Sequence, residues 1–187
     1  MNKRNMVAGG VAMSMLLAMT AYFESSGNVR LTAYQDQGGK WTICNGITKG
    51  VSPGMVVTAD WCERQQREEI TAHSAPLARV ERDLLAREKV AFTDLSYNIG
   101  TGAFGGSTAL RKLIAGDSMG ACNAILMWKG ATVNGRKVDC SQVGSGCSGI
   151  WVRRNVEQDV CLGNISVRDA QIIFGTLPVG GALWEGE

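Results

Sequence analysis

The chain has 187 residues, of which 45% are hydrophobic and 19% are charged. This length fits one domain with a short appendage, and this composition excludes a disordered chain or a highly charged scaffold. Nineteen basic residues against 17 acidic ones leave a net charge of only +2, so bulk charge does not indicate nucleic-acid binding.

The N-terminus begins with two basic residues and a long uncharged run. Lys3 and Arg4 precede nineteen residues without charge, 5–23. A positive start followed by an apolar stretch is typical of an export signal. The run is barely long enough to cross a bilayer as a helix, and its two glycines and two hydroxyl side chains weaken it. We therefore expect a weak signal-anchor helix over 1–23 and a catalytic domain over 24–187, with a cleaved signal peptide as the alternative.

The next segment, 29–47, is rich in β-branched and aromatic residues and turns at Gly38 and Gly39. This pattern predicts a small antiparallel hairpin or three-stranded sheet. From Thr58 onward, apolar residues recur at helical spacing. The predicted helices cover 58–72, 77–98, 107–115, 118–128 and 150–162, with loops at 74–76, 100–106, 130–149 and 178–181. The fold class is therefore α+β, a small sheet lobe followed by a helical lobe.

The last predicted helix carries a valine stripe. Val152, Val156 and Val160 recur at four-residue spacing, which predicts that they line one face of this helix. Arg153 and Arg154 are then expected to face elsewhere.

Six cysteines occur without any C-x-x-C spacing: Cys44, Cys62, Cys122, Cys140, Cys147 and Cys161. An exported chain would join them in up to three disulfides. We expect a Cys140–Cys147 bond, because these two are near neighbours across a Gly/Ser-rich segment, and the other pairings stay open. The alternative is a cytosolic chain with six reduced, buried cysteines.

Several weaker signals favour structural roles. Residues 100–105 match G-x-G-x-x-G, but a helical pattern precedes them where a dinucleotide site needs a strand, so we expect a loop between helices. His73, the single histidine, is expected at the surface or between helices. Trp128 and Trp151 are expected in the core.

Glu24, Asp36 and Thr42 form the most informative set. Glu24 ends the apolar run, and Asp36 and Thr42 flank the predicted hairpin turn. An acid at an apolar helix end has a raised pKa, whereas an aspartate in a polar turn stays ionised. Two carboxyl groups in different environments are what glycoside hydrolysis requires. The alternative is that both carboxylates are solvated and have no catalytic role.

Taken in order along the chain, these residues resemble the signatures of the phage-type lysozyme family, glycoside hydrolase family 24. The first signature corresponds to Glu24, R-L-T-A-Y-Q-D at 30–36 and W-T-I-C at 41–44. The second corresponds to L-S-Y-N-I-G at 95–100 and S-T-A-L-R-K-L at 107–113, and the third to 121–128 and 151–157. The resemblance spans about 22–162 and leaves 163–187 unexplained.

Two departures from the family pattern stand out. Eleven residues separate Glu24 from Asp36 where the family has eight, and Ser25-Ser26-Gly27 resembles a three-residue insertion. Ile47 stands where many relatives have a histidine. The Glu-Ser-Ser-Gly start is similar to one endolysin branch of enteric phages and prophages, and the weak anchor resembles that of signal-anchor-release endolysins.

The resemblance implies a lysozyme-like fold and an endolysin that hydrolyses the β-1,4 bond between N-acetylmuramic acid and N-acetylglucosamine. It implies Glu24 as the general acid, Asp36 and Thr42 as groups that position water or stabilise charge, and Tyr97 and Asn98 as substrate contacts. No cofactor, metal or nucleic acid is implied.

The expected partners are peptidoglycan, the host export machinery and the inner membrane. We expect the chain to be a monomer that moves from the inner membrane to the periplasm on release. Two alternatives stay open: an inactive wall-binding protein with this fold, and a protein that acts mainly on the membrane through 1–23.

Overall fold

The structure is a computed structural model that describes residues 1–25, 29–36, 38–166 and 169, with the backbone alone at 24 and 25. The α-helices are α1 (Gly10–Ser25), α2 (Ala59–His73), α3 (Ala86–Ile99), α4 (Thr101–Gly105), α5 (Thr108–Ile114), α6 (Ser118–Ala124) and α7 (Ser148–Leu162). The strands are β1 (Arg30–Gln35), β2 (Trp41–Cys44), β3 (Gly130–Val133) and β4 (Arg136–Asp139). Short 3-10 helices cover Lys3–Asn5, Ala75–Arg79 and Ile125–Met127.

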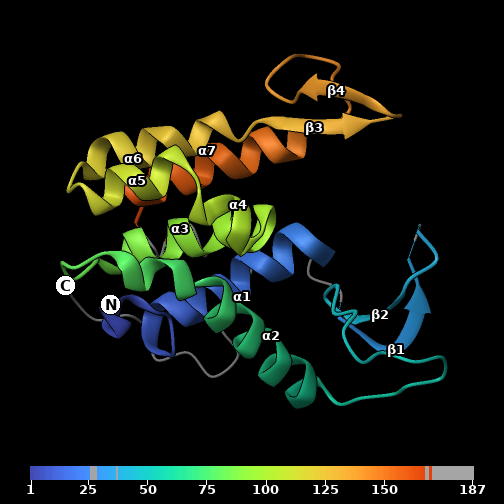
Figure 1. The fold of residues 1–187 in the computed structure, drawn as a ribbon. Coiled ribbons are helices and arrows are strands. Elements are labelled where there is room, and N and C mark those ends of the chain that lie inside the picture. The colour runs from blue at the N-terminus through green and yellow to red at the C-terminus, as the bar shows by residue number, and fades with distance from the viewer. Residues whose placement is uncertain (26–28, 37, 167–168, 170–187) are drawn as a thin grey trace.

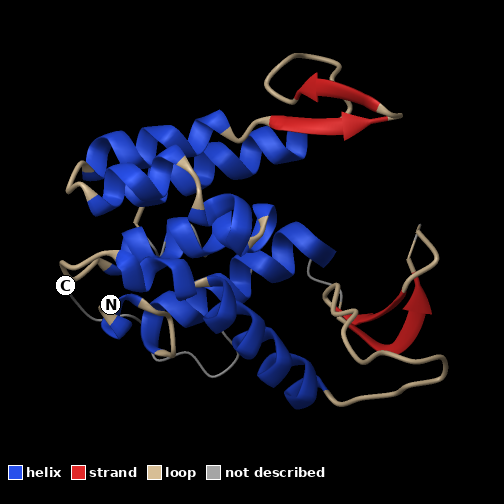
Figure 2. Ribbon diagram, in the orientation of Figure 1, coloured by secondary structure: helices blue, strands red, loops and turns tan. Residues whose placement is uncertain are grey.

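The helices form one body, and two hairpins extend from the same end of it (Figures 1 and 2). Helix α3 lies at the centre and packs against α1, α2, α4 and α7. Phe92 of α3 stacks on Phe104 of α4 with ring centroids 6.1 Å apart, within the largest apolar cluster. Trp128 packs against this cluster, as predicted, and Trp151 is half-buried. The predicted α+β class is confirmed.

The first hairpin forms where it was predicted. Strands β1 and β2 pair antiparallel, with Tyr34 opposite Thr42 and Gln35 opposite Trp41. Gly39 has a φ of +76° in the turn, a conformation that glycine adopts at little cost. The hairpin thereby places Asp36 at the end of β1 and Thr42 inside β2.

Helix α1 is part of the folded domain. Its buried residues pack against Ile70 of α2, Val90 of α3 and Val160 of α7. They include Met13, Met15, Leu16 and Met19, each at most 1% exposed. Burying four such side chains stabilises the docked helix by on the order of 6–12 kcal/mol relative to exposing them. Within the described part of the chain, no helix combines the length and apolarity needed to cross a bilayer.

The predicted helix 77–98 is wrong at its start, because α3 begins only at Ala86. Leu85 takes the N-cap position, and its backbone N–H donates to Glu88 Oε2 at 2.9 Å. The same carboxylate accepts two hydrogen bonds from Arg82. This buried acid satisfies an unpaired donor at the helix start and holds the preceding residues in a non-helical path.

Two segments that the sequence predicted as loops contain regular structure. Residues 101–105 form the short helix α4, and 130–139 form the hairpin β3–β4. Asn134 and Gly135 turn this hairpin with φ of +49° and +76°, both in the left-handed region. Asn-Gly is a strong signal for a two-residue hairpin turn, so this hairpin could have been predicted from the sequence. The predicted loop 178–181 lies outside the described residues.

Only part of the valine face of α7 is buried. Val160 is buried, but Val152 is 52% exposed and Val156 only half-buried. Arg153 and Arg154 are buried instead. Their guanidinium groups bind acids inside the domain, which overrides the apolar periodicity.

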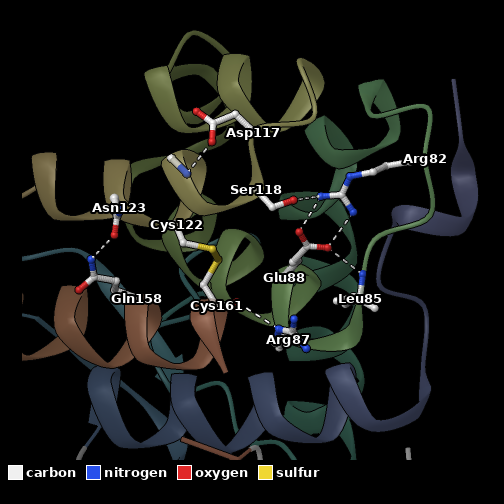
Figure 3. The surroundings of a disulfide bond; sticks show 11 residues. Arg82, Leu85, Arg87, Glu88, Asp117, Ser118, Cys122, Asn123, Gln158 and Cys161 are labelled. Carbon is white, nitrogen blue, oxygen red and sulfur yellow. Dashed lines mark hydrogen bonds and ion pairs between the residues drawn. A yellow bond between two sulfur atoms is a disulfide. The ribbon is translucent and has the colours of Figure 1, made fainter. Parts of the chain in front are cut away.

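Three disulfides join all six cysteines. Cys140–Cys147 forms as predicted, and the other two bonds are Cys44–Cys62 and Cys122–Cys161. Cys44–Cys62 ties the end of β2 to α2. Cys122–Cys161 ties α6 to α7 within the helical core (Figure 3).

Candidate active site

Two cavities meet at one residue of α3. The first has a volume of about 430 Å³ and is lined by 45–49, Glu69, His73, Tyr97 and Asn98. The second has a volume of about 400 Å³ and is lined by Phe23, Asn98, Gly146, Cys147, Gly149, Ile150 and Arg153. Asn98 lines both, so the two cavities lie next to each other near the end of α3, and we refer to them together as the cleft. The loop after β2 forms one side of the first cavity, opposite α2 and α3.

Tyr97 and His73 form a polar and aromatic surface on the helical side of the first cavity. Tyr97 Oη accepts a hydrogen bond of 3.0 Å from Gln66, and the two rings of Tyr97 and His73 lie 5.0 Å apart. His73 Nδ1 lies 2.8 Å from the carbonyl of Glu69. His73 is half-buried between helices, as predicted, and it also lines the cleft.

The orientation of the Asn98 amide follows from its partner. Arg154 Nη2 donates to Asn98 Oδ1 at 3.1 Å, and an arginine has donors alone. The amide oxygen must therefore face Arg154, which directs the NH₂ group away from it. An exposed amide NH₂ can donate to a sugar hydroxyl or an acetamido carbonyl.

Behind the cleft lies a cluster of four buried ionisable residues, Asp94, Arg153, Arg154 and Glu157, which we term the ionic cluster. Arg153 Nε and Nη2 donate to the two oxygens of Asp94 at 2.8 and 2.9 Å. Arg154 Nη2 donates to Glu157 Oε1 at 2.7 Å. Two-point Arg–carboxylate contacts are strong and directional, which helps to offset the cost of removing these charges from water.

The environment shifts the pKa of each acid of the ionic cluster in a different direction. Burial would raise the pKa of Asp94, but the charge and hydrogen bonds of Arg153, together with a hydrogen bond from Glu157 and the charge of Arg154, outweigh it, so this pKa is lowered. Burial raises the pKa of Glu157 well above its usual range, although Arg154 opposes the shift. Asp94 is therefore the ionised partner of Arg153.

Arg153 also contacts the end of α1. Its guanidinium carbon lies 4.8 Å from the ring centroid of Phe23, a cation–π geometry. Glu24 directly follows Phe23 and belongs to the last turn of α1, but its side chain lies outside what the structure describes. Of the three residues that resemble an insertion, Ser26 and Gly27 also lie outside the described ranges.

On the hairpin side, Asp36 organises the turn. Its Oδ1 accepts hydrogen bonds from the backbone N–H groups of Gly38 at 2.9 Å and Lys40 at 2.8 Å. Thr42 is 3% exposed, and its hydroxyl donates to the Lys40 carbonyl at 3.1 Å. Neither side chain lines the two cavities among the described residues, whereas Tyr97 and Asn98 line the first.

The ionic cluster was not predicted from the sequence. Its signal was present in Arg153, Arg154 and Glu157, which lie three and four residues apart on one predicted helix, and in Asp94 between Phe92 and Leu95. A charge on an apolar helical face indicates a buried partner. In the described residues no group of three His, Cys, Asp or Glu side chains could hold a metal ion.

Comparison with known proteins identifies the family. The phage lysozyme family profile matches residues 24–157. The chain is 37% identical over 147 residues to the SAR-endolysin of Escherichia phage 933W, covering 72% of this chain and 76% of that protein. It is 32% identical over 154 residues to the SAR-endolysin of Pseudomonas phage phiKMV, covering 82% and 89%.

A solved structure agrees with this result. The endolysin from Escherichia coli O157:H7 phage FAHEc1 superposes with a TM-score of 0.68 at 27% identity, covering 86% of this chain and 98% of that one. Fold, family profile and relatives therefore agree, and the chain belongs to the phage lysozyme family as a glycoside hydrolase, a muramidase endolysin that acts on peptidoglycan.

Proposed function

We propose that Glu24 is the general acid that protonates the glycosidic oxygen between N-acetylmuramic acid and N-acetylglucosamine. The observation that carries this proposal is the position of Glu24. It follows Phe23, which lines the second cavity, and it is the residue at which the family match begins. An acid at a helix end beside a cleft can reach the scissile bond while part of its environment stays apolar, which favours a proton donor.

Asp36 and Thr42 act from the hairpin side. Two backbone amides bind Asp36 Oδ1 and fix the carboxylate, so we assign Oδ2 to the attacking water or to the developing oxocarbenium charge. The Thr42 hydroxyl, oriented through the Lys40 carbonyl, takes part in holding that water. Tyr97 and the Asn98 amide bind the sugar chain in the cleft.

Replacing the acid tests this assignment. Glu24→Gln keeps the size of the side chain and removes the proton, so it should lower turnover by about 10²–10⁴-fold. The assay is the turbidity loss of outer-membrane-permeabilised Gram-negative cells, together with detection of new muramic acid reducing ends. Glu63→Gln is the matched control, because Glu63 is an exposed helical glutamate that pairs with Arg67 and lines neither cavity.

Two outcomes contradict the assignment. Equal lysis by Glu24→Gln and the parent would place the acid elsewhere. If neither the parent nor Glu24→Gln releases new reducing ends, the result would support an inactive wall-binding protein.

We further propose that residues 1–23 anchor the chain in the host inner membrane after export, and that release transfers α1 into the domain. Two observations support this. The curated relatives above are named SAR-endolysins. The uncharged run 5–23 would reach about 28 Å as a helix, close to the hydrocarbon thickness. Once released, Met13, Met15 and Leu16 pass from lipid to the interior of the domain, where they are buried.

Cell fractionation tests the anchor. The full chain should sediment with the inner membrane in energised cells and appear in the periplasm after an uncoupler collapses the membrane potential. Mass spectrometry of the periplasmic chain should find residues 1–23 retained. A periplasmic chain that begins after residue 20 would indicate a cleaved signal peptide and contradict the proposal.

A further inference from the structure

The ionic cluster lies where a purely structural core would place apolar side chains. Asp94, Arg154 and Glu157 are fully buried, and Arg153 is 4% exposed. Replacing a buried ion pair by packed apolar residues is often neutral or stabilising, so such a cluster is weak evidence for a stability role. Its contacts with the cleft indicate another role.

The first contact reaches the end of α1. Asp94 binds the guanidinium of Arg153 at two points, which fixes the plane of that group. The guanidinium in turn lies against the ring of Phe23 at 4.8 Å. Asp94 thus fixes Arg153, and Arg153 holds the last turn of α1 against α7.

The second contact reaches the substrate side of the cleft. Arg154 Nη2 donates both to Glu157 Oε1 and to Asn98 Oδ1, at 2.7 and 3.1 Å. Without that donor, the Asn98 amide could rotate, and either its oxygen or its NH₂ could face the cleft. Arg154 therefore selects which hydrogen-bonding group the cleft presents at the residue that lines both cavities.

We propose that the ionic cluster consists of positioning residues that serve two parts of the active site, through two pairs that meet where Arg153 Nε lies 3.6 Å from Glu157 Oε1. Asp94 and Arg153 fix the end of α1 that carries Glu24, and Arg154 with Glu157 fixes the Asn98 amide for substrate. This inference rests on the proposed function of Glu24 and Asn98. Because α1 contacts Arg153 through Phe23, the first part is complete only when α1 is docked.

The two parts predict different kinetic signatures. Displacing the acid affects the transition state more than ground-state binding, so it lowers kcat. Losing the orientation of a binding amide weakens the bound substrate, so it raises KM. A merely structural role would lower the melting temperature, reduce the apparent kcat in proportion to the folded fraction and leave KM unchanged, so kcat is calculated per folded enzyme.

The test compares three substitutions in the full, oxidised chain on soluble uncross-linked glycan strands. Asp94→Asn keeps the shape but cannot accept two hydrogen bonds from Arg153, and we expect kcat to fall about tenfold with KM within about twofold. Arg154→Lys keeps the charge, but a single ammonium replaces the planar fork, and we expect KM to rise about fivefold with kcat within about twofold.

Glu88→Gln is the matched control. Glu88 is 3% exposed, lies on the same helix as Asp94 and binds Arg82 at two points, 2.9 and 2.6 Å. Figure 3 shows this pair beside Leu85 and Ser118. Neither Glu88 nor Arg82 lines either cavity. Glu88→Gln should lower stability and leave kcat and KM within about twofold.

Double variants test whether the cluster acts through the named residues. Arg154→Lys added to Asn98→Ala should change KM no further, and Asp94→Asn added to Phe23→Leu should change kcat little further, since coupled residues are not additive. If Asp94→Asn does not fold, Phe23→Leu alone should still lower kcat, because it leaves the ionic cluster intact.

Hydrogen exchange tests the positioning role of the ionic cluster independently of whether Glu24 is the general acid. Asp94→Asn should speed exchange in 20–25, and Glu88→Gln should not, whatever Glu24 does. Unchanged exchange and kcat in folded Asp94→Asn, additive double variants, or equal kinetic losses in Glu88→Gln would overturn the inference. Full activity of Glu24→Gln beside fast exchange in Asp94→Asn would overturn the proposed acid alone.

Discussion

The two sides of the cleft hold their polar groups by different means. On the hairpin side, Asp36 and Thr42 bind backbone atoms only two to four residues away. On the helical side, Asn98 binds a residue 56 positions away, and Arg153 binds one 59 positions away. Local contacts form with the turn itself, whereas the long-range contacts require the whole domain to be folded.

This difference suggests separate vulnerabilities. On the hairpin side, changing a single side chain should lower catalytic activity and leave the local fold intact. On the helical side, removing a binding partner that lies far along the chain should displace the residues of the cleft. Four measurements test this contrast.

The disulfides should show the largest effect. Cys122–Cys161 closes 39 residues and ties together two helices, and Cys44–Cys62 closes 18 and ties the hairpin to α2. Loop-closure entropy predicts losses of about 4 and about 3 kcal/mol when each pair is replaced by serines. Urea unfolding of the two double-serine variants measures this. A larger loss from the hairpin pair would reverse the expected order.

Removing the charge of Asp36 should affect activity and leave the fold intact. In Asp36→Asn the amide oxygen can still accept from Gly38 and Lys40, so we expect the free energy of unfolding to change by less than about 1 kcal/mol. The lost carboxylate should lower turnover by about 100-fold. Initial lysis rates and urea unfolding of the same preparation check both statements. A destabilised variant that keeps its activity would make Asp36 a turn residue alone.

Replacing Thr42 should lower turnover less than replacing Glu24 or Asp36. A hydroxyl orients water but carries no net charge, so Thr42→Ala should lower turnover about tenfold, which is less than Glu24→Gln. Thr42→Ser should recover most of this loss because it keeps the donor to the Lys40 carbonyl. Full turnover in Thr42→Ala would show that its assigned role is wrong.

Glu157 should change the pH dependence of stability more than stability itself. Its folded-state pKa is raised, so its contribution is fully present below the ordinary carboxyl value of about 4.5 and is lost as pH rises toward the folded value. Glu157→Gln resembles the protonated form and should match the parent at acidic pH. It should become relatively more stable as pH rises.

Asp94 has the opposite sign, because its lowered pKa adds stability above its ordinary value of about 3.8. It remains in both proteins and is ionised in the folded and unfolded states above about pH 5, so the difference between the two proteins above that pH reports on Glu157. Thermal unfolding of parent and variant from pH 4 to pH 8 checks this. Parallel curves would contradict the raised pKa.

The same contrast explains what the sequence could predict. The hairpin follows from alternation and a glycine turn within 29–47, so its boundaries and the places of Asp36 and Thr42 were predicted closely. The Cys140–Cys147 bond was likewise a local inference. The second hairpin carried an equally local Asn-Gly signal at 134–135 and was missed because its glycines were interpreted as a loop.

The helical side was harder because its determinants are distant. The valine stripe of α7 did not reveal that Arg153 and Arg154 are buried, since their partners Asp94 and Asn98 lie on α3. The start of α3 was misplaced for a similar reason, because the Glu88 side chain binds back to Leu85. Apolar periodicity indicates which face of a helix is apolar. It does not detect a charged side chain that is buried because its partner lies elsewhere in the chain.

The docked position of α1 has a consequence for surface composition. Ala8 and Gly9, which directly precede α1, are exposed in the folded domain, where polar residues would ordinarily be accepted. Under the proposed anchoring, the same positions face acyl chains before release. A lysine at either position would then leave the activity of the purified enzyme unchanged and weaken its attachment to the membrane. Under that proposal, the uncharged character of these positions serves the membrane stage and not the folded enzyme.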